Sequence, residues 1–123
     1  MEILALPDDF WDEFDFSDGE LLYAETHLTE AMLHVRYLYS DNIDREIYLD
    51  ILIGNGYDDN RGSFHAEIQW DSGNRPVAYY TCKTHEDLKK LTHMALEQVH
   101  KELNEHRLSY YGKIWETITV NLE

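Results

Sequence analysis

Three residues near the end of the sequence have the types and spacing of a metal site. His93, Glu97 and His100 stand at positions i, i+4 and i+7, so on a helix they project from one side and could reach a common zinc ion. The trio lacks the H-E-x-x-H spacing of zinc proteases, and Glu97 also stands at the i,i+4 spacing of an ordinary surface ion pair with Lys101. A solvated helix face explains the pattern better, so we expect no metal ligands and no cofactor.

A second group of residues could support acid–base catalysis. His65 and Glu67 share one face of an expected strand, and Asp50 lies among apolar neighbours, so a carboxylate and an imidazole could meet on the open side of a sheet. An acidic residue within a strand is more often half-exposed or paired with a base such as Arg36. The sequence contains no glycine-rich phosphate loop and no G-x-S-x-G elbow, and Cys82 is expected to be a small core residue. We therefore expect no catalytic residues and no enzymatic activity.

Charge is the property in which this sequence departs most from an ordinary domain. It has 25 acidic residues against 10 lysines and arginines, a formal net charge of −15. The first 35 residues hold ten acids and no lysine or arginine, whereas from Arg36 onward 15 acids face 10 bases, a net of −5. Such a field repels nucleic acid and anionic membranes and attracts cationic surfaces. We expect a basic protein partner and no direct binding to nucleic acid or membrane.

Residues 7–20, PDDFWDEFDFSDGE, interleave these carboxylates with aromatic rings. One interpretation docks the rings on the core, where each contributes about 2 to 3 kcal/mol by burial. Another places Phe10 and Trp11 at a binding surface as anchors within a carboxylate rim, and both can hold at once. Four aspartates in later loops form a second acidic patch. The expected partner-binding residues are Asp8, Asp9, Phe10, Trp11, Asp12, Glu13, Asp15 and Asp18, with Asp41, Asp44, Asp58 and Asp59 in the second patch.

The element whose local signals agree best is a helix from Thr84 to His106. Thr84 can cap the first turn, and Asp87 three residues later gives a weak capping box. Apolar residues then recur at helical spacing and predict a helix of about six turns that lies across a β-sheet. The apolar stripe comprises Leu88, Leu91, Ala95, Val99 and Leu103, with Met94 and Leu96 beside it.

Residues 17–40 allow two interpretations. Apolar residues at spacings of three and four follow Ser17-x-x-Glu20 and would give one long helix. The run LHVRYLY at 33–39 is instead rich in strand formers and alternates in polarity, which indicates a hairpin. We favour the hairpin, with strands near 20–26 and 31–39.

The remaining segments complete an α+β domain. Alternating or apolar runs predict strands at 46–53, 64–70, 77–83 and 114–122, and the connectors between them are rich in Gly, Asn, Asp and Pro. The sequence therefore predicts one domain over residues 1–123, with a mostly antiparallel sheet of four to six strands and one long C-terminal helix packed across one face. One cysteine and the lack of an apolar leader or span indicate a cytoplasmic protein.

In size, acidity, single-cysteine usage and α+β build, the chain resembles the small immunity proteins that bacteria make to neutralise toxins, and equally small phage inhibitors of host defence nucleases. The resemblance is one of general character and assigns no residue roles. It implies a non-enzymatic inhibitor whose carboxylates replace phosphates in the nucleic-acid groove of a toxin or effector nuclease. The alternatives are a small metal-dependent or hydrolytic enzyme and a structural subunit of a larger assembly. The sequence indicates no oligomeric state.

Overall fold

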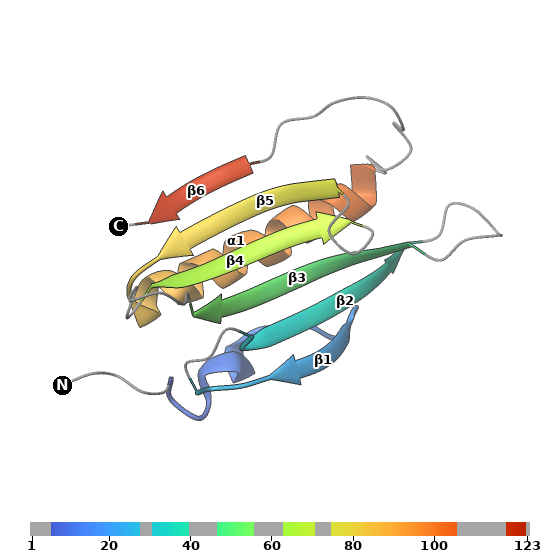
Figure 1. Ribbon diagram of the computed structural model, residues 1–123. Helices are drawn as coiled ribbons and strands as arrows, with labels where there is room; N and C mark the ends of the chain where they lie inside the picture. The colour runs from blue at the N-terminus through green and yellow to red at the C-terminus, as the bar shows by residue number, and fades with distance from the viewer. Residues whose placement is uncertain are drawn as a thin grey trace.

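A computed structural model describes residues 6–27, 31–39, 47–55, 63–70, 75–105 and 118–122 of the 123. Six strands form one mixed sheet in the order β1-β2-β3-β4-β5-β6 (Figure 1). The strands are β1 (Glu20–Ala24), β2 (Leu33–Tyr39), β3 (Ile47–Asn55), β4 (Phe64–Trp70), β5 (Arg75–Cys82) and β6 (Ile118–Leu122). In these ranges, no helix has the length and apolar character needed to span a membrane.

The sheet is antiparallel from β1 to β5, and β6 joins it in parallel beside β5. A parallel neighbour needs a long crossover connection, and the helix α1 (His85–Glu105) lies in that connection. The sequence predicted a mostly antiparallel sheet and one long C-terminal helix, and both features are confirmed.

Helix α1 begins where its capping residue predicts. The backbone N–H of Asp87 donates to Thr84 Oγ1 at 3.1 Å, which satisfies one of the N–H groups that a first turn leaves unpaired. The helix contacts β3, β4 and β5, and its apolar stripe belongs to the same buried cluster as the strands. Four stripe residues are fully buried, namely Leu88, Leu91, Ala95 and Val99.

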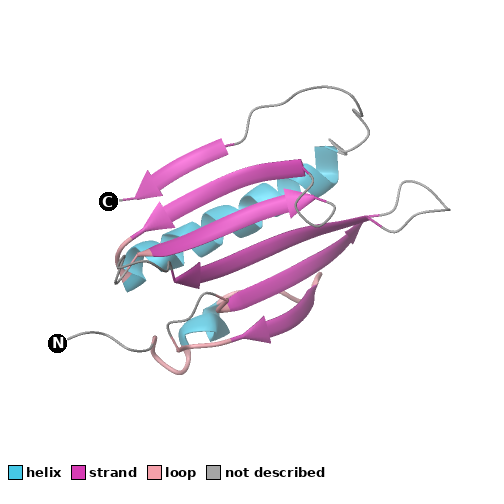
Figure 2. Cartoon of the chain, in the orientation of Figure 1, coloured by secondary structure: helices cyan, strands magenta, loops and turns pink. Residues whose placement is uncertain are grey.

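The strands have one buried and one wetter face. In β4, Phe64, Ala66, Ile68 and Trp70 are buried, while the residues between them are half-exposed. The core lies between the buried face and two helical segments, α1 and the short 3-10 helix η1 (Phe10–Glu13). Figure 2 shows both helical segments on the same side of the sheet. The opposite face carries polar side chains such as His34, Asp50 and Glu67, together with the exposed Leu38.

The hairpin interpretation of residues 17–40 is confirmed, and the single-helix alternative is wrong. Pairing with β3 buries Leu33, Val35 and Tyr37 on one face of β2, which a helix could not do with this alternation. The pairing of β1 with β2 shifts between Leu21 and Tyr23, as a bulge does, and the expected strand at 20–26 ends at Ala24.

Candidate functional site

The N-terminal aromatic residues are part of the core. Phe10 is 2% exposed and Trp11 8%, and their rings meet edge to face with centroids 4.8 Å apart. The Trp11 indole N–H donates to the Glu25 carbonyl oxygen at 2.8 Å, so its polar atom is satisfied as well. The docking interpretation describes these rings correctly. Both rings are buried in this structure, and the expectation that Phe10 and Trp11 act as anchors for a partner stays a prediction.

The carboxylates between these rings point outward. Because the rings take the inward positions of a short helical turn, the intervening side chains have only the solvent side available. We call residues 8–18 the acidic segment. Its six carboxylate residues are all exposed, and they are Asp8, Asp9, Asp12, Glu13, Asp15 and Asp18. Within the described part of the chain, no lysine, arginine or histidine forms an ion pair with Asp8, Asp9 or Asp12.

Helix α1 holds the acidic segment at two points. Glu13 accepts from Lys89 Nζ at 3.1 Å and lies 3.4 Å from His93 Nε2, and Asp18 pairs with His100 five residues further along the segment. The hydrogen bond from Lys89 lowers the pKa of Glu13. The segment is therefore tied to the helix by side chains as well as by its buried rings.

The same contacts show where the histidines of the metal-site pattern lie. His93 and His100 each face a different carboxylate of the acidic segment, so they do not converge on one point with Glu97. Among the described residues there is no group of three or more histidine, cysteine, aspartate or glutamate side chains arranged to hold a metal ion.

Exposed leucines follow the acidic segment directly. Leu21 is 48% exposed and Leu22 is 41% exposed, and both lie on β1, which is the edge strand of the sheet. Sequence reasoning did not single out either leucine, because Leu21 fitted the apolar spacing of the helix alternative for residues 17–40. Exposure on an edge strand depends on the strand order, which local patterns do not specify. The second acidic patch, with Asp41, Asp44, Asp58 and Asp59, lies outside the described residues.

A buried ion pair lies on the opposite face of the sheet. Asp50 is 1% exposed, and its Oδ1 atom is 2.9 Å from both Arg36 Nε and His34 Nε2. Arg36 lies directly across from Asp50 in the strand pairing, and its guanidinium also sits 4.6 Å from the centre of the Tyr48 ring. The hydrogen bond to Asp50 raises the pKa of Arg36. The expected pairing of Asp50 with Arg36 is confirmed.

The imidazole that meets Asp50 belongs to a different residue from the one considered in the sequence. His34 occupies that position, while His65 stacks on Tyr79 with ring centroids 6.3 Å apart. His34 and Arg36 lie two residues apart on one face of β2. Knowledge of the hairpin register would therefore have indicated both residues as partners of Asp50. We interpret Asp50 as a buried charge that is neutralised within the sheet, because His34 and Arg36 both meet its Oδ1 atom.

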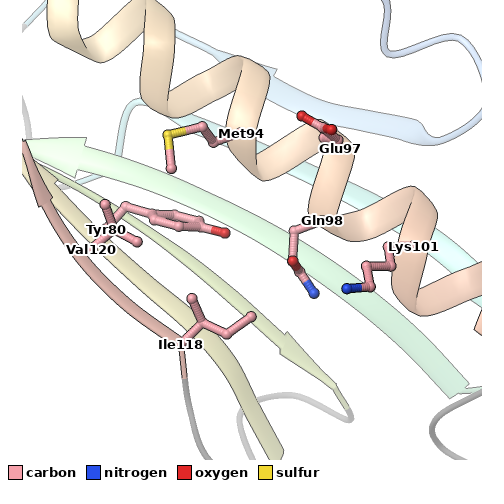
Figure 3. Close-up of a pocket in the computed structure, with 7 residues that line it drawn as sticks. All are labelled: Tyr80, Met94, Glu97, Gln98, Lys101, Ile118 and Val120. Carbon is pink, nitrogen blue, oxygen red and sulfur yellow. The ribbon is translucent and has the colours of Figure 1, made fainter.

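A cavity of about 390 Å³ lies between α1 and the strands β5 and β6. Its strand side is formed by Tyr80, Ile118 and Val120 (Figure 3). Its helix side is formed by Met94, Glu97, Gln98 and Lys101. The cavity exists because α1 lies over β3 to β5, while β6 is added at the outer edge of β5.

Comparison with known proteins leaves the function to be argued from these residues. No protein-family model matches the chain, and no curated protein or solved structure matches it either. The described residues therefore offer three features to weigh: the acidic segment, the Asp50 ion pair and the cavity. Within the described residues, Asp8, Asp9 and Asp12 of the acidic segment are exposed and form no ion pair, so this segment is the strongest candidate for an interaction surface.

Proposed function

We propose that this protein is a non-enzymatic inhibitor that binds a basic protein and covers the nucleic-acid groove of that partner. The partner class that fits best is a nuclease-type bacterial toxin or defence effector, whose groove carries lysines and arginines that hold phosphates. The observation that carries the proposal is the outward array of carboxylates at Asp8, Asp9 and Asp12, exposed and without an ion pair among the described residues.

Unpaired like charges destabilise a folded protein, so a cluster of them calls for a physical explanation. Acids close together repel one another and oppose the compact state, so a cluster of them needs a compensating benefit. Complementary charge on a partner supplies that benefit, because a carboxylate cluster raises the rate of encounter with a basic protein by roughly 10 to 1000 fold at low salt. Ordinary solubility needs a net charge of about 2 to 8 in magnitude, well below the −15 of this chain.

Rigidity of the acidic segment supports the same proposal. Burial of Phe10 and Phe14 and the contacts of Glu13 with α1 fix the backbone that carries the carboxylates. Charges on a fixed backbone lose less conformational entropy on binding than charges on a free tail. The exposed Leu21 and Leu22, next along the chain, take the role of apolar contacts that the buried rings cannot fill.

The proposed site of action is the cytoplasm. The only cysteine, Cys82, is a buried free thiol, and burial raises its pKa to about 12, so it is kept in the unreactive protonated form. A protein with one such thiol depends on no disulfide for its fold, which suits a reducing compartment.

Affinity capture tests the proposal. Immobilised protein is exposed to lysate of its native host at about 50 mM salt, and bound chains are eluted with salt rising to about 500 mM and identified by mass spectrometry. The proposal predicts a basic protein that elutes as salt rises, carries nuclease activity and loses that activity when this protein is added. A captured chain that is acidic, that resists elution by salt or that has no nuclease activity to inhibit would count against it.

A further inference from the structure

The two edges of the sheet differ in how well they are protected against pairing with another strand. β1 and β6 are the edges among the described strands, and Figure 1 shows them on opposite sides of the sheet. Natural sheets protect an exposed edge with charged side chains, prolines or bulges, because its free N–H and C=O groups can pair with a further strand. β1 has two of these features, the charge of Glu20 and a bulge between Leu21 and Tyr23. β6 has none of them.

β6 is an uncharged and regular strand of residues that favour sheets. Its sequence is ITVNL, in which Ile118, Thr119 and Val120 are β-branched, and its pairing with β5 runs without a shift in register. Its apolar side chains pack against the core but are only half-buried. Among the described residues, no backbone hydrogen bond reaches β6 from any segment other than β5. In a chain with a net charge of −15, this uncharged edge lets a second copy approach with little local repulsion.

The order of side chains in β6 fits antiparallel pairing of the strand with a second copy of itself. Pairing centred on Val120 places Ile118 opposite Leu122 of the second copy, so apolar side chains meet on the core face. On the other face, the exposed Thr119 lies opposite Asn121 of the second copy. Asn121 Oδ1 already accepts a hydrogen bond from β5 at 3.0 Å, so its amide N–H groups remain to donate to the Thr119 hydroxyl. The strand is therefore complementary to itself about a two-fold axis.

We propose that β6 is a dimerisation edge, at which two copies of this chain pair antiparallel and form one continuous sheet. The acidic segments, which lead into β1, then lie on the two far sides of the joined sheet. This dimer goes beyond the proposed inhibition and does not depend on it. Its response to salt has the opposite sign: salt screens the repulsion between two copies that each carry −15 and strengthens the dimer, whereas it weakens binding to a basic partner.

Sedimentation equilibrium of the purified protein measures the self-association. Strand pairing over five residues gives a small interface, so the dimer is weak and its share should rise between about 10 μM and about 1 mM chain. The dissociation constant should be at least about threefold lower in about 500 mM salt than in about 100 mM salt. The mass of one chain at every concentration, or a dimer that dissociates as salt rises, would overturn the proposal.

Charge variants at the two exposed positions of β6 make the test specific. Thr119→Glu with Asn121→Glu places like charges opposite each other twice across the two-fold axis, and should weaken the dimer at least about tenfold. Thr119→Lys with Asn121→Lys should do the same. An equimolar mixture of the two double variants should form a heterodimer at least about tenfold more tightly than either variant pairs with itself, because opposite charges then meet. Such a rescue excludes loss of folding as the cause.

The other edge of the sheet supplies the matched control. Leu21→Glu with Leu22→Glu adds the same two charges at exposed positions of β1, and this variant should dimerise within about twofold of the native protein. No heterodimer in the mixture of β6 variants would overturn the proposal. Dimerisation that is lost in the β1 variant and kept in the β6 variants would place the contact on the wrong edge and overturn it as well.

Discussion

At the residue scale, the carboxylate of Asp50 is the group in the sheet whose burial needs the most compensation. A charge at 1% exposure is tolerated only when partners replace the water that it has lost, and here Arg36 and His34 do so through one oxygen. Removing the charge leaves the Arg36 guanidinium without its counter-ion while that guanidinium still lies over the Tyr48 ring.

Asp50→Asn is therefore expected to be strongly destabilising. Breaking a buried ion pair from one side costs about 3 to 5 kcal/mol, and the amide recovers only part of the hydrogen bonding. The free energy of unfolding in urea measures the loss. Glu67→Gln, a half-exposed acid on the same face, is the matched control and should change stability by less than about 0.5 kcal/mol. Equal effects of the two substitutions would show that the Asp50 pairing adds nothing to stability.

Gly19 is a second residue whose role depends on a single contact. A Cβ atom added there would lie 2.8 Å from Cε1 of Tyr37, whose ring is fully buried and cannot move aside. Gly19→Ala should reduce the free energy of unfolding by about 1 to 3 kcal/mol through this overlap. The double variant Gly19→Ala with Tyr37→Leu should lose less than the sum of the two single losses. Strict additivity would mean that the overlap is relieved in some other way.

The sequence predicted the pairing of Asp50 with Arg36. It did not predict the contacts that depend on the strand register or on how distant segments come together. His34 joins Asp50 because β2 pairs with β3 in a register that only the folded hairpin defines. Gly19 lies against Tyr37 through a close approach of backbone to ring that no local pattern encodes. Tyr80 faces the cavity because β6 adds beside β5, and the sequence did not indicate that arrangement.

At the element scale, the acidic segment and α1 act as one unit, although some 80 residues separate them in sequence. Glu13 contacts Lys89 and His93, and the Phe14 ring lies 4.7 Å from the His93 ring, centroid to centroid. These contacts join the acidic segment to the first half of α1.

The ion pair of Glu13 gives this junction a pH dependence. The hydrogen bond from Lys89 holds the pKa of Glu13 below its ordinary value of 4.5, so the pair stabilises the fold above that pH. The contribution is lost as pH falls through the lowered pKa. Glu13→Gln should therefore reduce the free energy of unfolding near pH 7, and the difference from the native protein should disappear as the pH falls below the lowered pKa of Glu13.

Urea unfolding at a series of pH values measures that difference. Asp12→Asn is the matched control, because Asp12 lies on the same turn, is exposed and has no ion pair among the described residues. A Glu13→Gln effect that persists unchanged in acid would mean that it arises from something other than the charge of Glu13.

Sequence patterns located most elements because local signals and burial agree there. The helix expected from Thr84 to His106 is found at His85–Glu105, and the alternation in β4 is reproduced residue by residue. The parallel pairing of β6 was not foreseen, because a strand's own side chains do not specify which neighbour it joins. One interpretation of the aromatic run placed its rings on the core, and the packing of Phe10, Trp11 and Phe14 agrees with it.

At the scale of the whole molecule, the decisive property is the uneven distribution of charge. The acidic segment holds six of the 25 acids within residues 8–18, and all six reach solvent. The sequence alone predicted both the charge and its concentration, since counting needs no structure. It offered the docking of the aromatic rings on the core as one of two interpretations, and it did not indicate that exposed leucines follow the segment on β1.

A binding measurement with two charge-matched variants tests this account most directly. One variant carries Asp8→Asn, Asp9→Asn and Asp12→Asn, and the other carries Glu67→Gln, Glu86→Gln and Glu97→Gln. Both lose three negative charges, so they share the same change in net charge and differ in its position. The dissociation constant for the captured basic partner is measured for each at low salt and near about 150 mM salt.

We expect the acidic-segment variant to bind about tenfold or more weakly than the native protein, and the other variant to bind nearly as the native protein does. The native protein's own affinity should fall as salt rises, and the acidic-segment variant should show a weaker dependence on salt. Equal losses in the two variants, or no loss in either, would contradict the claim that the acidic segment is the surface that meets the partner.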